Sequence, residues 1–189
     1  SWTVPRALPS AEIALLIEQF AESAAILKAS GFSGVEISAG HGHLFHQFLS
    51  PWSNRRDDEY GGDWEGRTRI VRELVAALRA ACGTGFAIGL KLPGDDGIRG
   101  GIGPAEAAIL GRILTRERNV DYVSFAGGAH ARTLEMHTPD RFGPPMPYMG
   151  FIKNLGPELH GVPLMALGRI VDPAEADGIL ARGEAQLIG

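Results

Sequence analysis

The chain has very little cysteine, because Cys82 is the single one among 189 residues. One cysteine excludes a disulfide within the chain, and it excludes a metal cluster held by several of the chain's own cysteines. The sequence also lacks an apolar run of the roughly 18 residues that a transmembrane helix needs. It has no apolar segment of the signal-peptide type. We therefore expect no membrane contact and a cytoplasmic location.

A large excess of positive charge is absent as well. With 18 basic and 22 acidic residues, the formal net charge is −4, which gives no electrostatic basis for binding nucleic acid or an anionic membrane. The composition is that of a soluble globular protein, with 44% hydrophobic and 21% charged residues. We expect a small-molecule substrate as the partner, and formation of a homo-oligomer stays open.

Helical and strand-like segments alternate along the chain. The spacing of apolar residues predicts helices at 10–30, 64–81, 104–116, 148–156 and 172–183. Short apolar runs predict strands at 34–38, 86–90, 122–125, 162–167 and from residue 185 onward. Apolar strands that alternate with helices indicate an α/β fold with a parallel sheet covered on both sides.

The connections favour a barrel over a doubly wound sheet. No G-x-G-x-x-G motif follows a strand, which argues against a dinucleotide-binding doubly wound fold. A (β/α)₈ TIM barrel suits the pattern, yet five strands alone would leave two unpaired edges. We therefore expect residues 1–189 to form a single partial TIM-barrel domain, truncated at both ends.

Three histidines follow the first predicted strand, and His41 comes directly after its end. Catalytic residues of a barrel lie at the carboxyl ends of its strands, and a neutral imidazole can donate or accept a hydrogen bond near pH 7. The alternative is a loop histidine whose nitrogens are satisfied by the backbone. His41, His43 and His46 also form an H-x-H-x-x-H pattern, but no matching ligands stand out elsewhere, so we expect no metal site.

Lys91 ends the second predicted strand after an apolar run. Its charge would then point into the mouth of the barrel, where it could pair with an anion or with an electron-rich cofactor atom. The structural alternative is an ion pair with Glu36 or Asp95 across neighbouring strand ends.

Gly168 and Arg169 end the fourth predicted strand. In a TIM barrel the loops after strands seven and eight form the usual phosphate site, where glycine allows close approach and arginine offers two parallel donors. The alternative is an arginine that faces solvent in an ordinary turn.

Two charged segments complete the candidates. Asn54–Glu59, together with Arg67 and Arg69, is interpreted as a structural ion-pair network. The long loop 127–147 carries His130, Arg132, Glu135 and His137, and loops of this kind often form lids or substrate walls.

Three stretches resemble one known family. The first is the segment from Pro5 to the GFSGVEI of residues 31–37, and the second is QFLSP at 47–51 followed by NRR, DEYGG and E-x-R-x-R. The third is MALGRI at 165–170, followed by Asp-Pro. Their order and spacing are similar to those of the old yellow enzyme family of FMN-dependent NADH:flavin oxidoreductases.

This resemblance implies an FMN-binding barrel of which the chain supplies strands four to eight. Ser38 and His41 fall on the two positions that hydrogen-bond the substrate, and Lys91 falls where the family usually has an arginine that contacts the flavin ring. The resemblance further implies that three residues lie near the FMN phosphate: Gly168, Arg169 and Gly189.

The same resemblance implies hydride transfer between a small organic substrate and the flavin. Ser38 departs from the usual histidine or tyrosine and favours the amine-oxidising, N-demethylating branch typified by trimethylamine dehydrogenase, with His41 holding or deprotonating the amine. Reduction of an α,β-unsaturated carbonyl with NAD(P)H is the alternative. The residues also leave open a flavin-free aldolase or isomerase with Lys91 as Schiff-base nucleophile, and a non-catalytic half-barrel assembly module.

Overall fold

The computed structural model describes residues 6–129 and 133–189 and contains one parallel sheet. Its strands follow one another in chain order: β1 (Gly34–Ser38), β2 (Ala87–Asp95), β3 (Tyr122–Gly127), β4 (Leu164–Ala166) and β5 (Leu187–Ile188). Every neighbouring pair is parallel. A doubly wound sheet reverses its strand order at a switch point, whereas a barrel does not. The expected partial (β/α)₈ order is therefore confirmed.

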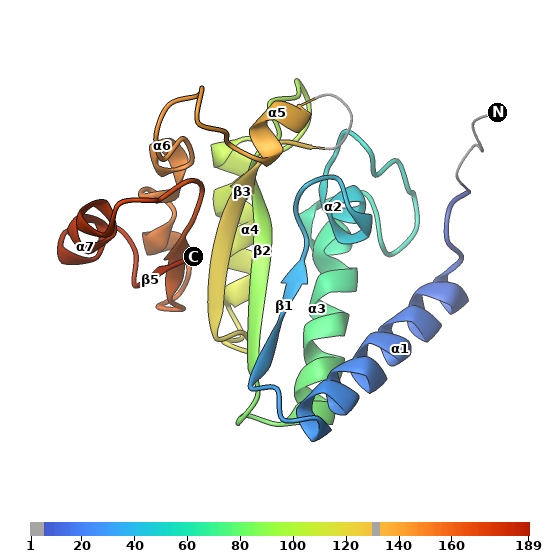
Figure 1. Cartoon of the computed structure of the whole chain (residues 1–189). Helices are drawn as coiled ribbons and strands as arrows, with labels where there is room; N and C mark the ends of the chain where they lie inside the picture. The colour runs from blue at the N-terminus through green and yellow to red at the C-terminus, as the bar shows by residue number, and fades with distance from the viewer. Residues whose placement is uncertain (1–5, 130–132) are drawn as a thin grey trace.

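Long helices connect the first three strands and pack beside them (Figure 1). The helices are α1 (Ser10–Ala29), α2 (Leu44–Leu49), α3 (Trp64–Cys82), α4 (Pro104–Thr115), α5 (Leu134–His137), α6 (Met149–Ile152), the 3₁₀ turn η1 (Gly156–Glu158) and α7 (Pro173–Ala181). Figure 1 shows α3 and α4 behind the sheet, with α1 alongside α3. Among residues 6–129 and 133–189, none of the helices is both long and apolar enough for a membrane span.

Several boundaries follow from residue chemistry. Asp63 caps α3 by accepting a hydrogen bond from the N–H of Gly66 (2.9 Å), and Gly83 ends that helix with φ +71°. Asp172 caps α7 in the same way. α1 begins at Ser10, and Pro9 precedes it without a side-chain hydrogen bond to cap the helix.

Three details differ from what the sequence predicted. The helix predicted at 148–156 divides into α6 and η1, because Pro157 has no N–H with which to continue an α-helical ladder. β2 runs beyond Lys91 to Asp95, with a register shift between Pro93 and Asp95 that accommodates the proline. α2 lies in a segment where no helix was predicted.

The two faces of the sheet differ in chemistry. The face toward the helices carries fully buried apolar side chains, among them Ile88, Leu90, Leu92, Val123 and Phe125. The other face, expected to be apolar, carries polar side chains on its first three strands: Glu36, Ser38, Lys91, Tyr122 and Ser124. In a barrel this second face is the inner one, and polar groups there are available to a bound ligand.

Candidate active site at the carboxyl ends of the strands

The predicted catalytic residues, Ser38 and His41, lie at the carboxyl end of β1. Figure 1 shows α2 and α5 at this same end of the sheet, so the loops that follow β1 and β3 meet there. Ser38 is the last residue of β1, is exposed, and is paired in register with Lys91 on β2. The register thus places Ser38, at the end of β1, beside Lys91, in the middle of β2, on the inner face.

His41 is half-buried directly after β1. Its backbone is left-handed, with φ +61°, and its ring stacks on that of His137 from α5, with 3.7 Å between ring centroids. Burial, together with smaller contributions from the neighbouring His137 and Lys91, lowers the pKa of His41 to about 4. The imidazole is therefore neutral near pH 7.

The Nε2 nitrogen of His41 is buried and makes no hydrogen bond in the described part of the chain. Buried polar atoms are normally hydrogen-bonded, so an unsatisfied one at the carboxyl end of a barrel strand is a candidate contact for a ligand. The alternative of a loop histidine whose two nitrogens both bond to backbone groups therefore does not hold for Nε2.

Lys91 makes one of the two ion pairs considered from the sequence. Its Nζ lies 2.7 Å from Oε1 of Glu36, and Ser124 Oγ donates to the other Glu36 oxygen at 3.4 Å. Asp95 instead accepts the N–H of Gly97 at 2.8 Å. The Lys91 and Glu36 side chains are 28% and 24% exposed, so the pair stays open toward the inner face.

The Gly168–Arg169 turn follows β4. Both residues have positive φ, +102° and +58°, and Gly168 lies against Tyr148 so closely that a Cβ there would come within 2.4 Å of the ring. Gly189 follows β5, where its N–H donates to Ala166 O at 2.8 Å. Because β4 and β5 are paired, all three glycine and arginine positions expected near a phosphate lie on adjacent strand ends.

Arg169 does not simply face solvent. Its guanidinium donates to the carbonyl oxygens of Gly143 (2.6 Å), Pro144 (3.1 Å) and Arg141 (3.3 Å), and so holds the loop that follows β3. A guanidinium has five N–H donors, so these contacts leave capacity for an anion. Its expected role at a phosphate stays a prediction.

The charged segment after α2 forms the expected structural network. Asn54 is buried and donates to the carbonyl oxygens of Phe48 (2.6 Å) and Tyr60 (2.8 Å), and Arg67 donates to Asn54 O at 2.8 Å. Arg56 pairs with Asp58. These contacts fix the loop between α2 and α3.

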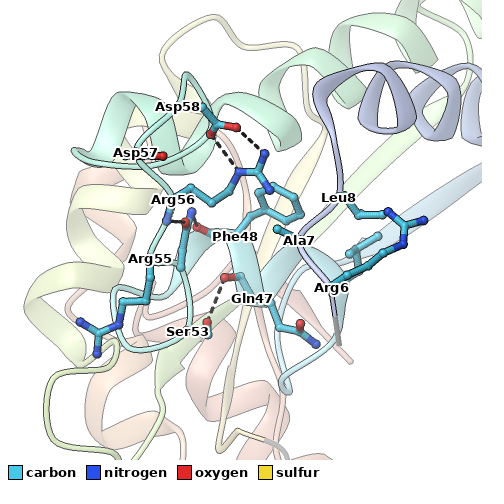
Figure 2. A pocket seen from close by; sticks show the side chains of 12 residues that line it. Arg6, Ala7, Leu8, Gln47, Phe48, Ser53, Arg55, Arg56, Asp57 and Asp58 are labelled. Atoms are coloured by element: carbon cyan, nitrogen blue, oxygen red, sulfur yellow. Dashed lines mark hydrogen bonds and ion pairs between the residues drawn. The ribbon is translucent and has the colours of Figure 1, made fainter. Parts of the chain in front are cut away.

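A pocket of about 530 Å³ lies beside this network, between α2, its following loop and residues 6–8. Figure 2 shows the Arg56–Asp58 pair at its wall, whereas Arg6 and Arg55 point away from each other. None of the predicted site residues lines it. Its size alone therefore does not make it the candidate active site.

The three histidines of the H-x-H-x-x-H pattern diverge. His46 turns inward, where its Nε2 lies 3.0 Å from Asp96 Oδ1, whereas His41 stacks on His137. Among the described residues, no group of three or more histidine, cysteine or acidic side chains is arranged to hold a metal ion. His130 and Arg132, which were considered with the long loop, lie outside the described residues.

Asp96 is the site residue that the sequence did not single out. Two acids in succession near a strand end, Asp95 and Asp96, were the available signal. Only the structure separates them, because Asp95 is the partly exposed last residue of β2 and Asp96 is buried against His46.

Comparison with known proteins now places the chain. A model described as the NADH:flavin oxidoreductase / NADH oxidase family matches residues 1–189. The chain belongs to this family. The resemblance to old yellow enzymes noted in the sequence is thereby confirmed.

Individual relatives cover several reactions. An NADH-dependent flavin oxidoreductase, iliE, of Neonectria sp. (strain DH2) is 34% identical over 98% of the chain and 25% of its own length. Histamine dehydrogenase from Rhizobium sp. 4-9 has a TM-score of 0.86 at 29% identity, over 97% of this chain and 26% of that one. Morphinone reductase has a TM-score of 0.77 at 29% identity, over 99% of this chain and 47% of that one. The chain therefore spans between a quarter and a half of the length of these proteins.

Proposed function

We propose that the protein to which this chain belongs is an FMN-dependent oxidoreductase that transfers a hydride between a small organic substrate and the flavin, with amine oxidation or oxidative N-demethylation as the favoured reaction. The observation that carries the proposal is His41. It is neutral near pH 7, lies at the carboxyl end of β1, and has a buried Nε2 that lacks a partner among the described residues.

The residues fit an FMN. Lys91 presents a cation on the inner face of the sheet, and Gly168 and Gly189 lie on paired strand ends together with Arg169. A positive charge suits the electron-rich edge of a reduced flavin, and glycine and arginine suit a phosphate. When bound, FMN supplies a two-electron acceptor or donor for the hydride.

His41 has a defined task in amine oxidation. Loss of a hydride from the carbon next to nitrogen requires the nitrogen lone pair, so the amine must be neutral when it reacts. An imidazole with a pKa of about 4 stays unprotonated and can accept a hydrogen bond from the amine N–H. The Ser38 hydroxyl, exposed at the end of β1, adds a small donor and acceptor beside it.

Enone reduction is the second candidate. The N–H of a neutral imidazole could instead polarise a carbonyl oxygen, with NAD(P)H as the source of the hydride, and the similarity to morphinone reductase supports this direction. Ser38 weakens it, because a serine reaches less far than the histidine or tyrosine that the resemblance leads one to expect at this position.

A flavin-free Schiff-base enzyme and a non-catalytic half-barrel have less support. A Schiff-base nucleophile must be a free neutral amine, whereas Lys91 is engaged in an ion pair with Glu36. A non-catalytic half-barrel would use the outer edge of β1 to pair with a partner, and an apolar pocket of about 440 Å³ does border that edge. Neither of these two functions makes use of the buried Nε2 of His41.

Anaerobic bleaching of the flavin absorbance tests the proposal. The FMN-loaded protein is mixed with N-methylated amines in one series, and with NADH followed by enones in another. Bleaching by an amine that is at least tenfold slower in His41→Ala supports amine oxidation. Bleaching by NADH followed by reoxidation by an enone assigns the second reaction. A flavin that none of these compounds reduces refutes both.

A further inference from the structure

A second histidine lies buried beneath the turn that carries His41. His46, in α2, has a side chain that is 2% exposed, and its Nδ1 accepts the N–H of Gly42 at 2.6 Å. A ring nitrogen that accepts a hydrogen bond carries no proton, so the proton of the neutral ring is on Nε2. Gly42 directly follows His41, and both residues have left-handed backbones, with φ +75° and +61°.

The protonated nitrogen of His46 faces a carboxylate. Its Nε2 lies 3.0 Å from Oδ1 of Asp96, whose side chain is also 2% exposed, in a bent contact. Neither atom makes a hydrogen bond in the described part of the chain, not even to the other, so the contact between them is electrostatic. The other oxygen of Asp96 accepts the N–H of Ile102 at 2.9 Å and faces Ser50 Oγ at 3.4 Å. A buried carboxylate needs such partners, so Asp96 is fixed in place.

Asp96 is also joined to the loop that follows β3. Thr133 Oγ1 donates to the backbone carbonyl of Asp96 at 2.7 Å and accepts the N–H of Ala129 at 2.8 Å. Thr133 immediately precedes α5, which carries His137. Asp96 therefore links the turn that carries His41 with α5, whose His137 stacks on the His41 ring.

We infer that His46 and Asp96 are positioning residues for His41. Asp96 holds the proton of His46 on Nε2, the free Nδ1 of His46 then holds the Gly42 N–H, and this bond keeps the left-handed turn that presents the His41 ring. A carboxylate that fixes the tautomer of a histidine is a common way to hold a functional ring in one orientation. The inference rests on the proposed function only in that His41 is the substrate contact.

The chain offers well-matched variants. Asp96→Asn removes the charge, and its amide cannot accept from both His46 and Ile102. Asp95→Asn is the control, because this neighbouring acid accepts from Gly97 and does not touch His46. His46→Gln places an amide donor near the Nε2 position, so it preserves the contact with Asp96, but it removes the acceptor for Gly42.

The experiment is ¹H–¹⁵N NMR of the histidine rings in the 189-residue chain without flavin. We expect His46 to be the Nε2–H tautomer, with contacts between the His41 and His137 ring protons in the wild type and in Asp95→Asn. Both Asp96→Asn and His46→Gln should weaken those ring contacts at least twofold and shift the Gly42 amide signal.

The inference fails if His46 carries its proton on Nδ1, or if the ring contacts and the Gly42 signal are unchanged in folded His46→Gln. Because His46→Gln retains a donor to Asp96, it separates loss of positioning from loss of folding if Asp96→Asn does not fold. No flavin or substrate takes part, so a failure of the proposed reaction would leave this result unaffected.

Discussion

At the scale of single residues, the sequence predicted where the site residues lie better than it predicted their pKa values and contacts. His41 could be placed at the candidate site from the sequence, because the carboxyl ends of barrel strands are where functional groups lie. Its low pKa could not, since that depends on burial and on His137, which is distant in the sequence. For Lys91 the sequence left Glu36 and Asp95 as equal partners, and only the register of β1 and β2 decides for Glu36.

The depressed pKa of His41 makes stability depend on pH. The unfolded chain binds a proton at His41 near the ordinary pKa of 6.5, whereas the folded chain binds it only near 4. Between these values unfolding takes up a proton, so the free energy of unfolding falls as the pH drops from about 6.5 to about 4. His41→Asn, which cannot titrate and tolerates a left-handed backbone, should show a smaller fall. Urea unfolding at pH 7 and at pH 4.5 measures the fall in the free energy of unfolding. An equal fall in the wild type and in His41→Asn would contradict the low pKa of His41.

The Lys91–Glu36 pair should show energetic coupling. Each side chain is about three-quarters buried, so Lys91→Met or Glu36→Gln alone leaves a partly desolvated charge or acceptor unmatched. We expect each single variant to lower the free energy of unfolding by about 1 kcal/mol, and the double variant to lose less than their sum. Strict additivity in a double-mutant cycle by urea unfolding would show that the pair contributes nothing.

At the scale of elements, the long helices and the strands were predictable and the short helices were not. The apolar spacing of α1, α3 and α4 and the caps of α3 and α7 are local signals. α2 is six residues long, and its buried His46 is held by Asp96, fifty residues further on, so no local pattern marks it. The turn at Gly168–Arg169 was predicted from the sequence, but the contacts of Arg169 with the loop at 141–144 depend on how two distant loops meet.

Arg169 should hold the loop after β3. Its guanidinium donates to three backbone carbonyls there, so Arg169→Ala removes all of these bonds at once. Amide hydrogen exchange in residues 140–147 should become at least fivefold faster in this variant. Arg182→Ala, which removes the ion pair with Glu184, is the control and should leave exchange in these residues unchanged. Unchanged exchange in Arg169→Ala would mean that the loop is held by other contacts.

At the scale of the whole molecule, strand order was the decisive feature. Parallel strands in the order β1-β2-β3-β4-β5, with polar side chains on one face, form a barrel segment whose inner face is open along the edges of β1 and β5 in the described residues. The alternation of helices and strands was sufficient to predict this. The polarity of the inner face was not expected, because the strands have too few polar residues for a clear alternating pattern.

The central claim is that this barrel segment belongs to a flavin site, and FMN titration by fluorescence quenching tests it most directly. The protein extended at both ends should bind FMN saturably, and Lys91→Ala should weaken the affinity at least tenfold while Lys91→Arg retains it. The 189-residue chain alone should bind weakly, because a five-stranded segment leaves the flavin partly uncovered. A folded, extended protein that does not bind FMN would contradict the account.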